Sequence, residues 1–247
     1  MLTGYNDAFI ISTEKREEIL TNCRTEDERS RTAELIRPIL RGRDIKRYGY
    51  NWADLWLIAT FPSRHYDIEM YPAVKAHLLS FGKERLEQIG KKYIINGEDV
   101  KARKKTSNKW FETQDSISYW EDFSKQQIVW IELSDEPKFA HVEMIMSVNT
   151  VFFMTGEHIL HLLGLLNSKL VTWYFRHCVG TTSGVGTNRW LKYTIEQIPI
   201  APVSSKLEKL VFDISKNYDE EKNREIDLNV CQLYNLNEEE IAHIISQ

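Results

Sequence analysis

The longest apolar stretch of the chain runs from 159 to 175, and its apolar residues fall on nearly every face of a helix. A helix that is apolar all round packs against other elements on several sides. We therefore expect a buried core helix here. The loop that follows, at 180–189, has glycines at positions 180, 184 and 186 with short polar residues around them. Its backbone can therefore approach a ligand closely.

Shorter apolar runs bounded by turn-forming residues predict strands. They lie at 5–11, 55–61, 128–133, 139–144 and 148–154. Helices are expected after Ser12 or Thr13, after Thr25 and from Pro72, because hydroxylated residues cap helices and proline suits their first turn. These helices are predicted to end near 20, 36 and 88. The segment 90–108 is polar and basic without a period, which predicts an exposed loop.

Strands in the middle of the chain, with helices before and after them, indicate a mixed α/β (α+β) fold. We expect a central mixed or antiparallel sheet, flanking helices and the long buried helix within residues 1–203. Residues 204–247 carry short amphipathic patterns, which predict helices. The predicted organisation is one main domain followed by a small helical carboxy-terminal extension.

Composition supports a globular protein, since 42% of the 247 residues are hydrophobic, enough for a real core. The formal net charge of −4 argues against a uniformly basic coat, yet positions 41–47 and 101–109 are basic and 219–240 acidic. Three widely spaced cysteines favour neither a disulfide framework nor a cysteine zinc site. Without a charged-then-apolar leader or a long apolar run, we expect a soluble cytoplasmic protein and no membrane partner.

Patterns for catalysis are weak. The chain lacks both the glycine-containing cofactor loop and the Asn/Asp-Pro-Pro-aromatic motif of a DNA methyltransferase. Asp122, Glu136 and Lys138 imitate a metal-dependent nuclease, but Pro137 would disrupt the strand that must present the last two. His158 and His161 lie one helical turn apart without a third ligand nearby in sequence. We therefore expect no catalytic and no metal-binding residue in this chain.

Binding chemistry is better represented. Guanidinium and ammonium groups near glycine and tyrosine suit phosphate contacts, and short donors and acceptors beside an arginine suit base edges. The candidate nucleic-acid-binding residues are Arg41, Arg43, Lys46, Arg47, Lys101, Arg103, Lys104, Lys105, Lys109, Thr182, Ser183, Thr187, Asn188 and Arg189.

Each of these groups has a structural alternative. The first segment could be a salt-bridged surface, the second a flexible solvated loop and the third an ordinary turn. We expect Trp190 to pack into the core and to hold the end of the glycine-rich loop, so that Arg189 reaches a groove. The competing interpretation pairs Arg189 with an acid such as Glu196 and makes it a brace.

Several motifs in a fixed order give the chain a family resemblance over roughly residues 3–202. The motifs are Gly4-Tyr-Asn-Asp-Ala-Phe9, the run from Arg37 to Tyr48, Tyr71-Pro72, Lys109-Trp-Phe-Glu112, Ser134-Asp-Glu-Pro-Lys-Phe139, Leu165-Leu-Asn-Ser-Lys169, Arg189-Trp190, Tyr193 and Gln197-Ile-Pro-Ile200. Together they resemble the TaqI-like carboxy-terminal specificity domain, the target-recognition module of bacterial DNA adenine methyltransferases and of fused restriction-modification enzymes. Thr113 and Gln127 depart from the residues that relatives often carry, leucine and lysine.

This resemblance implies a sequence-specific binder of double-stranded DNA with no enzymatic activity of its own. It also implies work with an S-adenosylmethionine-dependent adenine-N6 methyltransferase domain or subunit, into which the target adenine is flipped. Two other classes stay open. One is a protein-interaction module for assembling such a complex, and the other is a metal-dependent nuclease.

Overall fold

The computed structural model describes residues 1–95, 97–182 and 187–247, and its contacts divide the chain into two compact units. Unit 1 comprises residues 1–40, 52–121 and 145–149. Unit 2 comprises residues 41–51, 122–144 and 150–247. Helices and small sheets occur together, so the expected mixed α/β class is confirmed. Within the described residues, no helix combines the length and the apolar character needed to span a membrane.

Unit 1 is built on a sheet with the strand order β1-β3-β2-β8. The strands are β1 (Ile10–Ser12), β3 (Leu55–Ile58), β2 (Ile36–Leu40) and β8 (Met146–Ser147). β3 pairs antiparallel with both of its neighbours, whereas β2 and β8 are parallel. Leu57 and Ile58 of the central strand are fully buried, which explains the purely apolar run at this point of the sequence.

The helices of unit 1 begin largely where their caps predict. Ser12 caps α2 (Thr13–Thr21) by accepting a hydrogen bond from the Lys15 amide, and Thr25 caps α3 (Glu26–Leu35) in the same way. The strand predicted at 5–11 is partly wrong, because α1 (Asn6–Phe9) precedes β1. The single helix predicted from Pro72 is α4 (Pro72–Leu79) and α5 (Lys83–Leu86), interrupted where Gly82 takes a φ of +87°.

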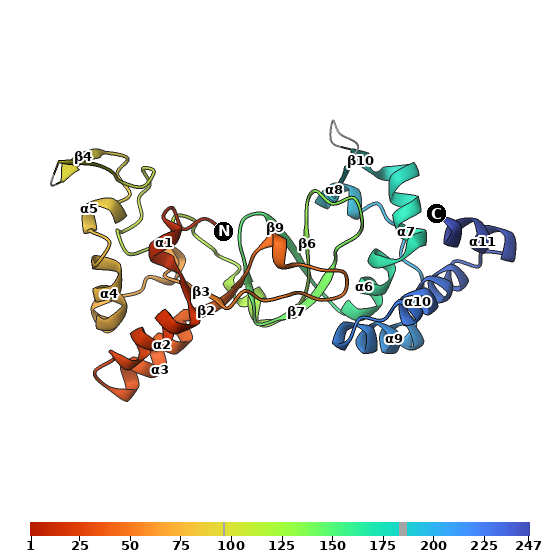
Figure 1. Ribbon diagram of the computed structural model, residues 1–247, viewed down its shortest axis with the longest axis horizontal. Helices are drawn as coiled ribbons and strands as arrows, with labels where there is room; N and C mark the ends of the chain where they lie inside the picture. Colours follow the sequence, from red (N-terminus) through yellow and green to blue (C-terminus); the bar gives the residue numbers. More distant parts are fainter. Residues whose placement is uncertain (96, 183–186) are drawn as a thin grey trace. The chain divides into compact units, whose positions relative to one another are not determined.

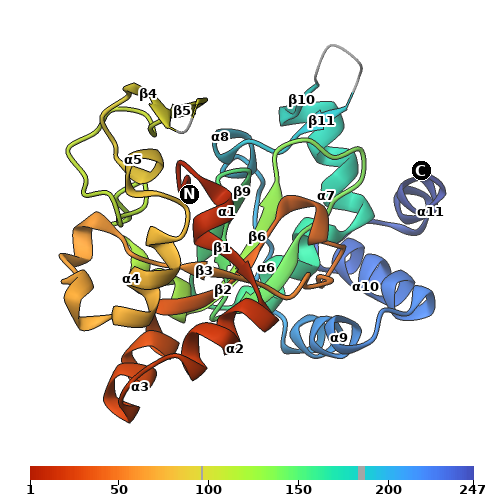
Figure 2. The same cartoon turned by 60° about the vertical axis from the view of Figure 1, so that its left-hand side comes forward.

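The basic segment predicted as an exposed loop is in part a hairpin. β4 (Lys92–Ile95) and β5 (Glu98–Lys101) pair antiparallel and lie side by side in Figure 2. Short 3₁₀ turns complete the unit: η2 (Pro62–Arg64), η3 (Ile68–Met70) and the start of η4 (Trp120–Ser124).

Unit 2 contains an antiparallel sheet with the order β7-β6-β9. Its strands are β6 (Gln126–Ile131), β7 (Ala140–Glu143) and β9 (Val151–Thr155), so the three strands expected in this part of the chain are confirmed. Val129 in β6 lies opposite Ala140 on one side and Phe153 on the other. The segment 41–51 adds the turn η1 (Gly42–Asp44), and Tyr48 makes an isolated parallel bridge to Ala140.

The long core helix is present but broken. α6 (Ile159–Asn167) ends before Ser168, α7 (Lys169–Tyr174) follows, and η5 (Phe175–Val179) continues as a π-helical turn. Ser168 has an extended ψ of 153°, and its hydroxyl accepts the Val171 amide as the cap of α7. The burial was predicted correctly, since Leu163 and Leu165 are completely inaccessible.

The carboxy-terminal helices α9 (Ser205–Lys216), α10 (Glu220–Leu233) and α11 (Glu238–Ser246) belong to unit 2. Figures 1 and 2 show α9 and α10 beside α6 and α11 beyond α7. A Cβ at Gly164 of α6 would lie 2.8 Å from Val211 Cγ2 and 2.9 Å from Leu207 Cδ1 of α9. The close contact of α6 and α9 therefore depends on the absence of a side chain at Gly164. The functional division predicted at Val203 stays a prediction.

Candidate nucleic-acid interface

The guanidinium of Arg41 is engaged within its own segment. Its Nε and Nη2 donate to the two carboxylate oxygens of Asp44, each at 2.9 Å, and its backbone amide donates to Oδ2 at 3.2 Å. This pairing closes η1 and holds the pKa of the Asp44 carboxyl below its usual value. The salt-bridged interpretation therefore describes Arg41.

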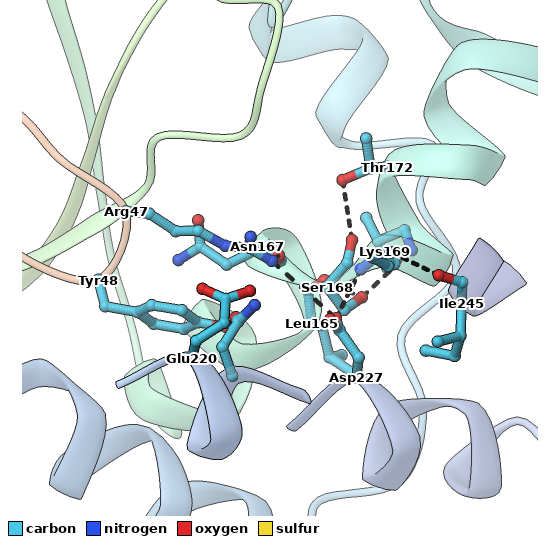
Figure 3. Close-up of polar contacts among 12 residues, drawn as sticks. Arg47, Tyr48, Leu165, Asn167, Ser168, Lys169, Thr172, Glu220, Asp227 and Ile245 are labelled. Atoms are coloured by element: carbon cyan, nitrogen blue, oxygen red, sulfur yellow. Dashed lines mark hydrogen bonds and ion pairs between the residues drawn. The ribbon is translucent and has the colours of Figure 1, made fainter. Parts of the chain in front are cut away.

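Arg47 is also an internal residue. Its Nη2 donates to the carbonyl oxygen of Asn167 and lies 4.0 Å from the carboxylate of Asp227, and Figure 3 shows the three residues together. Asp227 is 2% exposed and also accepts the backbone amide of Lys169 at 2.8 Å. Burial raises the pKa of Asp227, because its effect is larger than the opposite effects of the Arg47 and Lys169 charges. Arg47 consequently joins the basic segment to α6 and α10.

Asn167 explains why a polar Asn-Ser-Lys run interrupts the apolar core helix. Its Nδ2 donates to the Phe139 carbonyl at 2.9 Å, and its Oδ1 accepts the Phe139 amide at 3.2 Å. The amide thereby satisfies both backbone groups of a buried residue just before β7. These polar residues serve the fold, and the signal that could have revealed this role was their position inside an otherwise apolar run.

Two cations of the segment remain exposed. Arg43 and Lys46 form no side-chain hydrogen bond or ion pair within the part of the chain that the structure describes. The turn that presents Lys46 is fixed, since its amide donates to the Gly49 carbonyl at 2.8 Å. Tyr48, two residues after Lys46, is buried with a φ of 67°, and its backbone amide donates to the Phe139 carbonyl. Arg43 and Lys46 are therefore the residues of this segment that a phosphate could reach.

A second exposed basic surface lies on unit 1, and we call residues 91–95 and 97–105 the lysine hairpin. Lys92 and Lys101 stand directly opposite each other in the β4·β5 pair. The pairing continues through the Ala102 amide to the Lys91 carbonyl at 2.9 Å, and Lys104 and Lys105 follow. All five lysines are exposed, and none forms an ion pair within the described ranges. Sequence reasoning missed Lys91 and Lys92, because only the strand pairing brings them to this surface.

Arg103 differs from the lysines around it, because its side chain is turned inward. Although it lies in the lysine hairpin, it is only 4% exposed, and its guanidinium donates to four backbone carbonyls at 2.6–2.8 Å. The acceptors belong to Thr3, Leu86, Trp110 and Glu112. Burial lowers the pKa of Arg103 to about 10. This guanidinium supports the hairpin from inside, whereas the sequence predicted a contact of Arg103 with DNA. Lys109, in contrast, is exposed, with its ammonium 5.5 Å from the Phe111 ring centroid.

The glycine-rich loop is described in part, and Ser183 lies outside the described residues. Thr182 of β10 (Thr181–Thr182) pairs with Asn188 of β11 (Asn188–Arg189). Asn188 is buried and donates its side-chain amide to the Asp135 carbonyl at 2.9 Å, so it is used internally. Thr187, directly before β11, is partly exposed and open to a ligand.

Trp190 anchors the loop as expected. It is 1% exposed, its ring stacks on Phe175 with centroids 4.0 Å apart, and its indole donates to the Ser134 carbonyl at 3.0 Å. Arg189 pairs with Glu132, whereas Glu196 lies 3.6 Å from Lys192. The ion pair fits the competing interpretation, which gave Glu196 as an example of the acid, with Glu132 in that place.

The acids and histidines considered for a nuclease or a metal site each contact a different partner in the structure. Asp122 pairs with Lys125 at 2.6 Å, and Glu136 lies 3.2 Å from Arg176. The buried His161 contacts the Ala201 carbonyl at 3.1 Å and accepts the Ser204 amide. His158 lies 3.1 Å from Glu208. Among the described residues, no three histidine, cysteine, aspartate or glutamate side chains are grouped so that they could hold a metal ion.

The described residues form a mixed α/β fold with two exposed basic surfaces. A family model, the TaqI-like C-terminal specificity domain, matches residues 37–200, and the chain belongs to this family. The family's non-catalytic domains recognise DNA in restriction-modification systems. No curated protein matches the sequence.

Proposed function

We propose that the chain is the sequence-specific DNA-recognition module of a restriction-modification system. The observation that carries this proposal is the family match over residues 37–200, which includes both exposed basic surfaces. Their exposed cations form no ion pair with a carboxylate within the described ranges, as expected of groups that bind phosphates. The exposed cations of the two surfaces are Arg43, Lys46, Lys91, Lys92, Lys101, Lys104 and Lys105, and Lys109 is a further exposed cation within the matched residues.

The cross-strand pair Lys92 and Lys101 favours an anionic partner. Like charges directly opposite each other destabilise a strand pair, and a phosphate bound to both lysines would remove that repulsion. Base reading is proposed for the loop at 181–189, where Thr182, Ser183 and Thr187 supply hydroxyl groups. Phosphate contacts would thus position the domain, and the loop would provide sequence preference.

We further propose that the module works with an S-adenosylmethionine-dependent adenine-N6 methyltransferase domain or subunit. Family membership supports this proposal, and the sequence contains no methyltransferase motif of its own. The cofactor would bind to that partner, and this chain would hold the duplex while the adenine is flipped. The free Cys23, Cys178 and Cys231 suit a reducing compartment such as the cytoplasm.

The proposal is tested by fluorescence anisotropy of duplex DNA with the chain alone and with its methyltransferase partner over a range of salt concentrations. Affinity should fall steeply with salt, and the double variant Lys92→Gln/Lys101→Gln should make the logarithmic salt slope shallower by about 1.8. Lys75→Gln is the matched control, since Lys75 is in the same unit and pairs with Glu69 at 2.6 Å. Absence of binding at about 50 mM salt, with and without the methyltransferase, would refute DNA recognition. Salt-insensitive partner binding without DNA affinity would instead favour the protein-interaction class.

A further inference from the structure

Unit 2 has a cavity of about 460 Å³ next to the exposed Lys46, and none of the described residues of the glycine-rich loop lines it. One side is formed by the chain just after η1, and the other by the end of α9 and the residues beyond it. The volume falls in the range of sites for small ligands. The lining residues are Lys46, Arg47, Gly49, Tyr50, Asn51, Ile214, Ser215 and Tyr218. We call it the tyrosine pocket.

Two exposed tyrosines and the buried Ile214 are among the residues that line the pocket. Tyr218 is 50% exposed, and its position is fixed by a 2.8 Å hydrogen bond from its hydroxyl to Glu220 and by the Tyr48 ring 6.4 Å away. Tyr50 is 36% exposed and is held through its backbone bridge to Ile45. Exposed aromatic rings of this kind are suited to stacking on a nucleobase, since every base has a π-face.

The rim of the pocket supplies the polar groups that a nucleotide needs. Lys46 offers an exposed ammonium group, and Asn51 is exposed with its backbone amide bound to the Asp44 carbonyl at 2.8 Å. The Asn51 side-chain amide has no hydrogen bond to any other described residue, so its donor and acceptor are available to a base edge.

The two acids that follow Tyr218 each accept a hydrogen bond within the protein. Asp219 caps α10 by accepting the Lys222 amide at 2.9 Å, and Glu220 accepts the Tyr218 hydroxyl. Both carboxylates therefore have partners on their own segment.

We propose that the tyrosine pocket binds one unstacked nucleotide, with its base against Tyr50 and Tyr218, its edge toward Asn51 and its phosphate toward Lys46. This inference rests on the proposed DNA recognition, because a duplex held by Arg43 and Lys46 brings nucleotides to this surface. The pocket would make the domain prefer DNA in which one base unstacks easily. This preference would add to any recognition of base edges by the glycine-rich loop.

The first test uses deoxyadenosine monophosphate and needs no knowledge of the recognised site. Saturation-transfer NMR should show its base protons contacting the protein, and Tyr218→Leu and Tyr50→Leu should each weaken binding at least fivefold. Tyr218→Phe keeps the ring but loses the hydrogen bond to Glu220, so it should weaken binding less than Tyr218→Leu does. Tyr193→Leu is the control, since Tyr193 is 56% exposed in the same unit and lies outside the pocket. The absence of saturation transfer, or equal binding by all variants with unchanged melting temperatures, would overturn the proposal.

The second test separates this inference from the proposed function. A duplex with one extrahelical 2-aminopurine is compared with the fully paired duplex, and the pocket predicts tighter binding of the former with quenched fluorescence. Equal, salt-dependent binding of both duplexes without quenching would overturn the nucleotide pocket and leave DNA recognition intact. Binding of the mononucleotide without binding of either duplex would support the pocket and refute DNA recognition.

Discussion

Arg189 and Glu132 form an ion pair in which Nε and Nη2 of the arginine both contact Oε1 of the glutamate, the former at 3.0 Å. The pair joins the residue before Trp190 to the residue that follows β6, and the Trp190 amide donates to the Glu132 carbonyl at 2.7 Å. The end of the glycine-rich loop is thus tied to the sheet of unit 2 by side chain and backbone together. In this arrangement the Arg189 guanidinium acts as a brace.

Replacing Arg189 by alanine should therefore affect stability slightly and leave site preference unchanged. Both side chains are more than one third exposed, so the pair should contribute less than about 1 kcal/mol to the free energy of unfolding. Urea unfolding of Arg189→Ala, Glu132→Ala and the double variant gives the coupling. A loss of about 1–3 kcal/mol of discrimination at one base pair would show that Arg189 leaves Glu132 to read DNA.

Arg103→Met should destabilise the protein by about 3 kcal/mol or more, because it deprives several buried carbonyls of their donor. The measurement is chemical unfolding. Lys104→Met is the matched control, since Lys104 is the exposed neighbour and its replacement should change stability by less than about 0.5 kcal/mol. Equal effects of the two substitutions would contradict a supporting role for Arg103.

Asp44 predicts a pH dependence of stability with a definite sign. Its folded-state pKa lies below the ordinary value of 3.8, first because of the hydrogen bond from Arg41. Its stabilising contribution is therefore present above about pH 4 and is lost as the pH falls through the folded-state pKa. Asp44→Asn should cost about 1–2 kcal/mol at neutral pH and less at about pH 3. Urea unfolding at both pH values checks this, with the exposed Asp7→Asn as control; a cost that grows on acidification would contradict it.

Gly164→Ala should destabilise unit 2 by about 1–3 kcal/mol through overpacking between α6 and α9. Leu207→Ala, at one of the two clashing positions, is expected to relieve part of the strain in the double variant. Thermal unfolding of the single and double variants measures this coupling. Full additivity of the two substitutions would show that the helices do not meet at Gly164.

The sequence predicted local features better than it predicted the roles of charged residues. Caps at Ser12 and Thr25 act within four residues, so their helices could be located from the sequence alone. Arg103 illustrates the opposite case, because one of its acceptors is the carbonyl of Thr3, a hundred positions away. The sequence of a basic run does not distinguish an exposed arginine from a buried one whose acceptors are backbone carbonyls, because those acceptors have no side-chain signature. The break at Ser168 was missed for a related reason, since apolar burial on both sides concealed a capping residue.

The register of the lysine hairpin has a consequence for the unbound protein. Because Lys92 and Lys101 repel each other across the strands, dissolved salt should tighten the free hairpin by screening that repulsion. The same salt weakens phosphate binding by removing the gain from counterion release. Amide hydrogen exchange at Tyr93 and Val100 should therefore slow as ionic strength rises, while affinity for DNA falls. Slower amide exchange together with weaker DNA binding at high ionic strength would indicate that the lysine hairpin binds phosphates. A hairpin that is only solvated would not show this dependence of DNA affinity on salt.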